Sequence, residues 1–355
     1  MENHTLDLVR GMVKKGADVW VLCSDGEMVS LFEKAGAHVI IDRIRSDFDF
    51  AYIRRLVIFL KSRQIDIIHG HELKAGLNAL IAGYLAKTPL KIIHIHTPLS
   101  QWQVSPLKKK LNIAINRFIT NKLADKVIAL TESIKDVRIK EEGIESSKIV
   151  VIGNGVDLSQ FPIVASSTES NPDKPFVVGY LGRMTEEKGH DVLIKGFAEF
   201  LQNFKSQPAD TWPRLLLAST GHLEESLKKL AEDLGIRRNV SFLGAIPEDK
   251  KSYFYGDLDV FVFPSLAEGF GIVLLEAMAA STACLVSDLP VLKEVGDGSV
   301  LTFKVEDPLD LSQKLYSLFR DASRRSDLGR KARDRVASLY TLDKFWDNYA
   351  KLYGI

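Results

Sequence analysis

Cysteine, net charge and long apolar runs are all scarce in this sequence of 355 residues. The two cysteines, Cys23 and Cys284, lie far apart in apolar segments, which excludes a disulfide framework and predicts buried thiols in a reducing compartment. The longest uncharged apolar run covers residues 75–86 and is too short to cross a bilayer, which takes about 20 residues. The N-terminal residues do not have the pattern of a secretory signal. We therefore expect a cytoplasmic protein without a transmembrane helix.

The charges nearly cancel, with 47 Lys and Arg against 46 Asp and Glu, but they are unevenly distributed. Residues 1–152 contain 23 basic and 17 acidic residues, whereas the remainder contains 24 and 29. Two domains with different partners would explain this difference, and so would chance scatter of surface charge. No basic segment is interleaved with aromatic residues, so we expect no nucleic-acid partner.

Familiar catalytic motifs are also absent. The sequence contains no G-x-G-x-x-G, no P-loop, no G-x-S-x-G elbow and no H-E-x-x-H, which argues against a dehydrogenase, an NTPase, a serine hydrolase and a zincin. Two D-x-D pairs, Asp47 with Asp49 and Asp257 with Asp259, imitate a site for a metal–diphosphate complex. The first precedes a predicted helix and the second introduces a predicted strand, so structural roles are favoured for both.

Short apolar runs alternate with amphipathic segments along the chain. Runs that are apolar on both faces predict parallel sheets covered by helices, and the length favours two domains. The fold class is therefore α/β, with two tandem doubly wound, Rossmann-like domains and a polar linker at 164–173. The expected strands cover residues 18–24, 38–42, 66–70, 91–96, 126–130, 148–153, 176–182, 214–219, 240–244, 259–264, 283–287 and 300–303.

The first domain begins with an element that normally comes second. Residues 5–15 predict a helix, although a crossover helix usually follows a strand. Either this domain starts unusually, or its first strand and turn are missing.

The segment at 265–280 carries the strongest functional signal. A strand ends at Pro264, a loop contains Glu268, Gly269, Phe270 and Gly271, and a helix begins at about Ile272. Glycines before a helix N-terminus let a phosphate approach the backbone N–H groups. Glu268 and Glu276 would flank this seat and accept paired hydroxyls, although an ordinary loop and helix glutamate explain the pattern equally well.

A second segment follows the strand at 176–182. Gly182 and Arg183 come directly after it, and Lys188 follows five residues later. Two cations past the carboxyl end of a strand suit a diphosphate, because open α/β sheets bind ligands there.

Two H-x-H pairs lie near strand ends in the first half: His69 with His71, and His94 with His96. Strand alternation places each pair on one face, so a metal site is conceivable. No Cys or carboxylate completes the set in sequence, and we expect no metal.

Residues 105–123 form a basic amphipathic stretch with five Lys or Arg residues. Such a helix more often covers a sheet with its apolar side. The alternative is peripheral contact with an anionic membrane, on its inner face, where the helix would receive a lipid-linked acceptor.

Together these segments resemble the retaining glycosyltransferases of family 4, which have the GT-B fold. The resemblance rests on GYLGRMTEEKGHDVLIKGF, on VSFLGAIPEDKKSYFYGDLDVFVFPSLAEGFGIVLLEAMA, and on ADVWVLC, DIIHGHE, HIHTP and IGNGVD in the first half. It implies an acceptor-side domain over 1–157 and a donor domain over 158–355, facing each other across a cleft. The last helix, 341–353, would cross back to the first domain.

The resemblance also implies a role for each matching residue. Arg183 and Lys188 match the pair that neutralises the donor diphosphate, and Glu276 matches the carboxylate that holds the ribose. Glu268 matches the group that orients the donor sugar, and His96 matches the histidine that faces it. The implied catalytic residues are His96, Arg183, Lys188 and Glu268, and the implied donor-binding residues are Gly182, Arg183, Lys188, Glu268, Gly269, Phe270, Gly271, Ile272 and Glu276.

The implied activity is metal-independent transfer of a sugar from a nucleoside-diphosphate sugar to a glycan or lipid-linked acceptor, with retention and without a cofactor. The alternatives are a nucleotide-sugar epimerase on the same fold and a truncated, inactive nucleotide-binding remnant. The second alternative arises because the family begins with a strand and a glycine-rich turn, so the chain is expected to start late. The sequence also has Ser219-Thr-Gly221 where the family has Gly-x-Gly.

Overall fold

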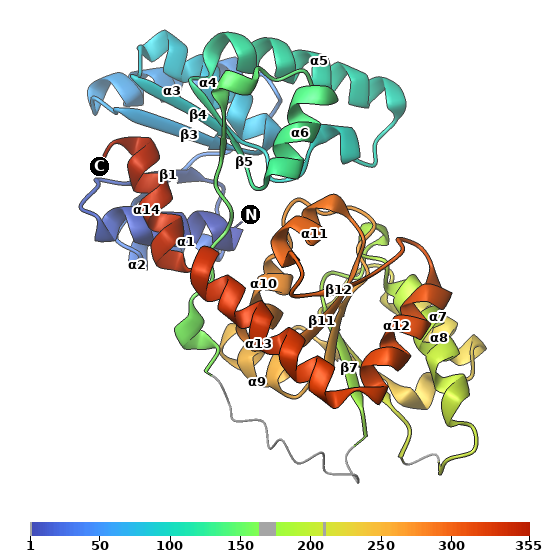
Figure 1. The fold of residues 1–355 in the computed structure, drawn as a ribbon. Coiled ribbons are helices and arrows are strands. Elements are labelled where there is room, and N and C mark those ends of the chain that lie inside the picture. The colour runs from blue at the N-terminus through green and yellow to red at the C-terminus, as the bar shows by residue number, and fades with distance from the viewer. Residues whose placement is uncertain (1, 163–174, 209–210) are drawn as a thin grey trace. The chain divides into compact units, whose positions relative to one another are not determined.

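A computed structural model describes residues 2–162, 175–208 and 211–355 (Figure 1). The predicted linker at 164–173 lies outside the described residues. The chain forms two compact units, of which the first comprises Met1–Gly155 with Leu342–Ile355 and the second comprises Val156–Thr341. This division falls two residues before the expected boundary, and the final helix belongs to the first unit.

The strands of the first unit are parallel and form two sheets. The smaller sheet pairs β1 (Trp20–Cys23) with β2 (His38–Ile41). The larger sheet has the order β3 (Ile67–His71), β4 (Leu90–His94), β5 (Lys126–Ala129), β6 (Ile149–Val151). Among the described strands, none pairs with the second edge of β1 or of β3. The expectation of an additional first strand stays a prediction.

The last helix of the chain completes the core of the first unit. Helix α14 (Leu342–Tyr353) packs beside α1 (Glu2–Lys14) (Figure 1), and Trp346 Nε1 donates a hydrogen bond to the Asp7 carbonyl at 2.8 Å. Phe345 and Tyr349 are buried in the same cluster as Ile92 of β4. The helices of this unit are α1 (Glu2–Lys14), α2 (Met28–Lys34), α3 (Phe50–Ser62), α4 (Glu72–Ala86), α5 (Pro106–Leu123), α6 (Glu132–Lys140) and α14 (Leu342–Tyr353).

The second unit contains one parallel sheet of six strands. Strands β10 (Val260–Phe263) and β11 (Ala283–Ser287) are buried at every position, which confirms the prediction of strands covered on both faces. The strand order reverses between β7 and β10, which are neighbours, so this is the switch point where α/β sheets bind ligands. The order is β12 (Leu301–Phe303), β11 (Ala283–Ser287), β10 (Val260–Phe263), β7 (Val177–Leu181), β8 (Arg214–Ala218), β9 (Val240–Gly244).

Helices connect these strands as the alternating sequence pattern predicts. The predicted helix after Gly271 begins at Ile272 as expected. The helices of this unit are α7 (His190–Leu201), α8 (Glu224–Asp233), α9 (Lys251–Gly256), α10 (Ile272–Ala279), α11 (Pro290–Gly296), α12 (Pro308–Arg320) and α13 (Ala322–Leu339).

The D-x-D pairs have the structural roles that were favoured. Asp49 is the N-cap of α3 and accepts hydrogen bonds from the backbone N–H groups of Tyr52 and Arg45, both at 2.9 Å. Asp259 accepts from the Val177 N–H at 2.8 Å and so ties the start of β10 to β7. Both cysteines are free thiols, but only Cys284 is buried as expected, because Cys23 lies in the half-exposed strand β1.

Helix α5 differs from the more common interpretation of its sequence. Its buried residues are the polar Asn116 and Thr120, whereas Leu107, Leu111 and Phe118 have exposed fractions of 79%, 57% and 68%. Three residues of the predicted apolar side therefore cover no sheet, whereas Ile115 and Ile119 on the same side are half-buried. Within the described ranges, no helix is both long and apolar enough to span a membrane.

Candidate functional site

The two loops with the strongest sequence signals meet at the switch point of the second unit. The first follows β7 and contains the short helix η4 (Glu186–Lys188), and the second joins β10 to α10. The Leu266 N–H donates to the Glu187 carbonyl at 2.9 Å and links them. Gly189 has a φ of 65°, and a Cβ there would come within 2.1 Å of the Pro264 carbonyl oxygen. This close approach requires glycine.

Lys188 and Glu268, which lie 80 residues apart in the sequence, form an ion pair here. The distance from Lys188 Nζ to Glu268 Oε2 is 2.6 Å, and both side chains are largely buried, with 18% and 14% of their surface exposed. The structure therefore brings together one predicted diphosphate-binding cation and one predicted sugar-binding carboxylate.

Arg183 is the second predicted cation of this loop. Its side chain is 75% exposed, and its nearest carboxylate is that of Glu187, at 4.0 Å. An exposed pair at this distance stabilises the fold little, so the guanidinium is available to a ligand at small cost.

The glycine-rich loop leads into the N-terminus of α10. Gly271 is the N-cap and offers no side-chain hydrogen bond to the first turn, which starts at Ile272. Gly269 and Phe270 are buried, and the Phe270 ring packs on Tyr340 at 5.7 Å. A helix N-terminus without a side-chain cap leaves its N–H groups and its dipole to an anion.

Glu276 is buried on α10 and has two partners on α9. Its Oε1 accepts a hydrogen bond from Lys251 Nζ at 2.9 Å, and its Oε2 accepts one from Tyr255 Oη at 2.7 Å. Burial raises the pKa of Glu276 above its usual range, although the Lys251 cation counteracts this. A carboxylate has about four acceptor sites, so Glu276 can still accept ligand hydroxyls.

Gly182 follows β7, and its N–H donates to the Ala218 carbonyl at 3.1 Å, next to the turn after β8. In that turn Ser219 has a φ of 99°, a left-handed conformation that glycine adopts more readily. The departure from Gly-x-Gly therefore places a strained serine beside the loop that follows β7.

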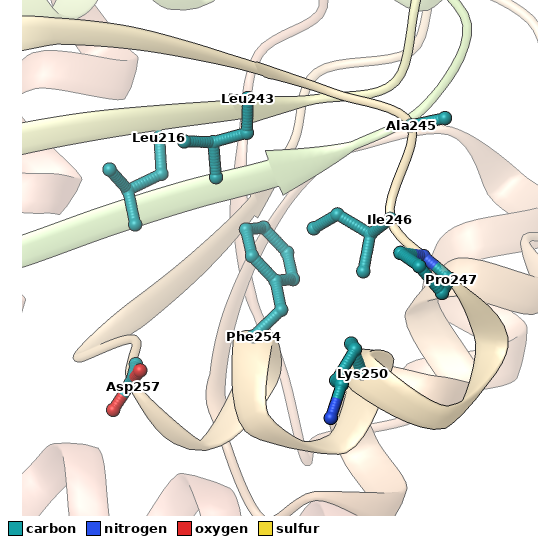
Figure 2. A pocket seen from close by; sticks show the side chains of 8 residues that line it. All are labelled: Leu216, Leu243, Ala245, Ile246, Pro247, Lys250, Phe254 and Asp257. Carbon is teal, nitrogen blue, oxygen red and sulfur yellow. The ribbon is translucent and has the colours of Figure 1, made fainter.

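A shallow hollow of about 380 Å³ lies elsewhere in the second unit. Figure 2 shows Phe254 and Ile246 between the strands that carry Leu216 and Leu243 and the segment that carries Lys250. Lys250 and Phe254 line this hollow, whereas Lys251 and Tyr255, the next residues along the chain, bond Glu276. No predicted site residue lines it.

His96, the predicted catalytic residue of the first unit, comes two residues after β4. Its backbone N–H donates to Glu72 Oε1 at 3.3 Å, and its Nε2 has no hydrogen-bond partner among the described residues. Burial, together with His4 and His71, lowers the pKa of His96, so its imidazole is neutral at neutral pH.

The sequence did not predict the residues that surround Glu276 in the second unit or His96 in the first. Lys251 and Tyr255 carry no motif, and only the packing of α9 on α10 identifies them as partners of Glu276. His4 of α1 lies with His71, His94 and His96, and its nearest such partner in sequence is 67 residues away. No sequence signal pointed to these contacts.

Comparison with family models matches both parts of the chain. Residues 163–335 match "Glycosyl transferases group 1", and residues 1–160 match "Glycosyltransferase Family 4". The chain is 25% identical to the capsular polysaccharide biosynthesis glycosyltransferase CapM of Staphylococcus aureus, over 99% of this chain and 94% of that protein. It is 30% identical to a D-inositol 3-phosphate glycosyltransferase of Corynebacterium urealyticum, over 81% of this chain and 69% of that protein.

Solved structures support the fold independently. HepE from Anabaena, crystallised with UDP-glucose, superposes with a TM-score of 0.83 at 19% identity, over 99% of this chain and 95% of that chain. The two α/β units with parallel sheets are those of the GT-B glycosyltransferase fold.

Proposed function

Because the chain belongs to the group 1 and family 4 glycosyltransferases, we propose that it is a retaining enzyme that moves a hexose from a nucleoside-diphosphate sugar to a glycan or lipid-linked acceptor. The observation that carries this proposal is the Lys188–Glu268 pair at the switch point of the second unit, next to the loop that leads into α10. A role in cell-envelope polysaccharide synthesis fits the capsular relative.

In this proposal the charge of the leaving diphosphate is met by three groups. Lys188 and Arg183 supply cations, and the N-terminus of α10 supplies N–H groups and the positive end of a helix dipole. These groups stabilise most strongly when the diphosphate departs, because negative charge on it then increases. The transfer is therefore expected to need no metal and no cofactor.

The two carboxylates are assigned to different parts of the donor. Lys188 turns to the diphosphate when the donor binds, which frees Glu268 to accept hydroxyls of the transferred sugar. Glu276 is held by Lys251 and Tyr255 and accepts the ribose hydroxyls. Each charge-assisted hydrogen bond of this kind contributes about 1.5–3 kcal/mol.

His96 is assigned to the sugar from the first unit. Its neutral imidazole offers a hydrogen bond without adding positive charge near an oxocarbenium-like centre. No separate base is needed, because a phosphate oxygen of the leaving group can take the proton of the acceptor hydroxyl.

The proposal is tested by calorimetric titration with UDP, GDP and ADP, followed by their sugar conjugates. We expect one nucleotide to bind, and Glu276→Gln to weaken it about 10- to 100-fold, which corresponds to the loss of about 1.5–3 kcal/mol. The matched control is Glu199→Gln, an exposed glutamate on α7, which is expected to leave binding unchanged. Absence of binding by all three nucleotides would contradict the proposal.

The product decides between transfer and its alternatives. We expect the anomeric configuration of the donor to be kept in the product, as read from proton NMR coupling constants. Conversion of the donor sugar without an acceptor would indicate an epimerase. Binding without any turnover would indicate an inactive remnant.

The acceptor side is proposed to contact an anionic membrane through α5. Its exposed apolar residues, Leu107, Leu111 and Phe118, recur at helical spacing and form one stripe. Lys108 and Lys110 are exposed beside this stripe, and a hollow next to it is lined by Phe48 and Phe118. A helix with an exposed apolar stripe and flanking cations lies in the interface of anionic lipids.

A further inference from the structure

Five of the eight histidines of the chain pack against one another in the first unit, although they come from three separate segments. His4 lies on α1, His69 and His71 lie on β3, and His94 and His96 lie at and after the end of β4. The strand register pairs His71 with His94, so neighbouring strands present their histidines side by side. The structure therefore adds His4 to the two H-x-H pairs that the sequence displays.

Four of these rings converge closely enough to share one ion. One ring nitrogen from each of His4, His71, His94 and His96 lies within 4.8 Å of the corresponding nitrogen of every other. In a tetrahedral zinc site with Zn–N distances of about 2.0–2.1 Å, the nitrogens are about 3.3 Å apart. Binding of the ion would require rotations of the imidazole rings that bring the more distant nitrogens closer together.

Three of these four histidines have ring nitrogens without another partner. Within the described part of the chain, His71 Nδ1, His96 Nε2 and both ring nitrogens of His94 are buried without a hydrogen bond. His94 is fully buried, and each buried polar group that stays unpaired costs about 1–3 kcal/mol. An ion that takes one lone pair from each of His71, His94 and His96 would remove part of that cost.

His4 is held in a tautomer that suits a ligand. Its Nδ1 lies 2.5 Å from Asn154 Oδ1, which can only accept, so Nδ1 carries the proton and Nε2 carries the lone pair. Tyr349 Oη lies 3.5 Å from Nε2 and competes weakly for this lone pair. A hydrogen bond on the distal nitrogen is the arrangement that orients histidine ligands in metal sites.

From these contacts we propose that His4, His71, His94 and His96 bind one Zn²⁺ ion, with Asn154 as a positioning residue. Imidazole nitrogens favour zinc and neighbouring transition metals, whereas Mg²⁺ and Ca²⁺ require oxygen ligands that this set does not contain. Four protein ligands make a closed site, as in structural zinc centres. The ion would fix α1 to the ends of β3 and β4.

The site lies wholly within the first unit and does not rest on the proposed function. Where both hold, they make opposite demands on His96, whose imidazole cannot serve the ion and the transferred sugar together. Zinc occupancy is therefore expected to lower sugar transfer without lowering nucleotide binding, which is assigned to the second unit.

The test is the zinc content of the full chain after removal of metal with a chelator and reloading. We expect about one zinc per chain after gel filtration, a higher melting temperature, and the visible spectrum of a tetrahedral site when Co²⁺ replaces zinc. His71→Gln and His94→Gln should each weaken zinc binding at least tenfold, and Asn154→Ala should weaken it about 10- to 100-fold.

Two histidine variants serve as controls. His69 is buried in the same cluster, with its Nδ1 2.7 Å from Tyr353 Oη, but it lies outside the ligand set, so His69→Gln should keep zinc affinity within a few-fold. His38 is exposed beside Asp18, and His38→Gln should change nothing. If His94→Gln does not fold, His4→Gln gives the same test from α1. Wild-type protein that retains no zinc, or zinc binding that survives both His4→Gln and His71→Gln, would overturn the proposal.

Discussion

Ser219, in the turn after β8, has a strained backbone conformation. Its φ of 99° forces a side chain into a conformation that costs about 1–3 kcal/mol for residues other than glycine. Its N–H still donates to the Gly244 carbonyl at 2.6 Å, so the tertiary structure holds it there. We predict that Ser219→Gly raises the free energy of unfolding by about 1 kcal/mol, measured by urea denaturation.

The neighbouring position supplies the control for this substitution. Thr220 is not among the residues with positive φ, so Thr220→Gly should lower stability through the entropy of the unfolded chain. Equal or lower stability of Ser219→Gly would contradict the assignment of strain to this turn.

At the residue scale, the proposed contact of Glu276 with the ribose predicts that nucleotide binding depends on pH. Its pKa is raised by burial, and only the ionised carboxylate accepts from both ribose hydroxyls. Binding should therefore be complete above the raised pKa and decline as the pH falls through it. Lys251→Met removes the cation that opposes this shift, so its pKa should rise further and the decline should begin at a higher pH.

Calorimetric titrations of wild type and Lys251→Met between pH 5.5 and 8 would measure this difference. Protonation of the nucleotide phosphates is common to both proteins and cancels in the comparison. Parallel pH profiles would mean that Glu276 does not contact the nucleotide.

At the scale of elements, helix α5 buries polar residues and exposes apolar ones, which is the reverse of the usual arrangement. Asn116 and Thr120 are buried and share a hydrogen bond at 3.1 Å, which leaves the apolar stripe of α5 in solvent. We predict that Leu111→Gln combined with Phe118→Gln reduces pelleting with anionic vesicles, because the stripe supplies the apolar contact. Lys108→Gln with Lys110→Gln should weaken it by about 1 kcal/mol per charge.

The control for α5 is Leu243→Gln, which removes an exposed leucine of the second unit. It should leave vesicle binding unchanged, and neutral vesicles should bind wild type less well than anionic ones. Equal binding to both vesicle types would refute the proposed membrane contact.

At the scale of the whole molecule, the chain crosses between its two units more than once. Phe345 of α14 is buried in the first unit although it follows the entire second unit in sequence, whereas Phe197 of α7 is buried in the second. Replacing either with Ala should cost about 3–5 kcal/mol. We predict that Phe345→Ala destabilises the first unit and leaves nucleotide binding intact. Phe197→Ala should instead destabilise the second unit.

Hydrogen exchange followed by mass spectrometry resolves the two units in one measurement. Peptides of the first unit should exchange faster in Phe345→Ala, with little change in residues 175–208 or 211–341. Uniform acceleration across both units would mean that they unfold as one cooperative body.

The sequence by itself determined the elements and the fold class. Strand β10 is apolar at every position and β11 at every position but Ser287, and several such short runs between helical segments favour a parallel sheet covered on both faces. It also located the loop after β7 and the loop before α10, because Gly271 before Ile272 marks a helix start and Lys188 follows a strand end. These signals are local, so a single sequence contains them.

Only the tertiary structure decided which distant side chains meet. Lys188 pairs with Glu268 because β7 and β10 are neighbours in the sheet, and Glu276 meets Lys251 because α9 packs on α10. His4 joins His71 and His94 because α1 lies against the core of the first unit. The sequence also did not indicate that α5 buries its polar residues Asn116 and Thr120. Such contacts depend on how elements pack. Periodicity along the chain indicates which face of an element is buried, but not which residue of another element contacts it.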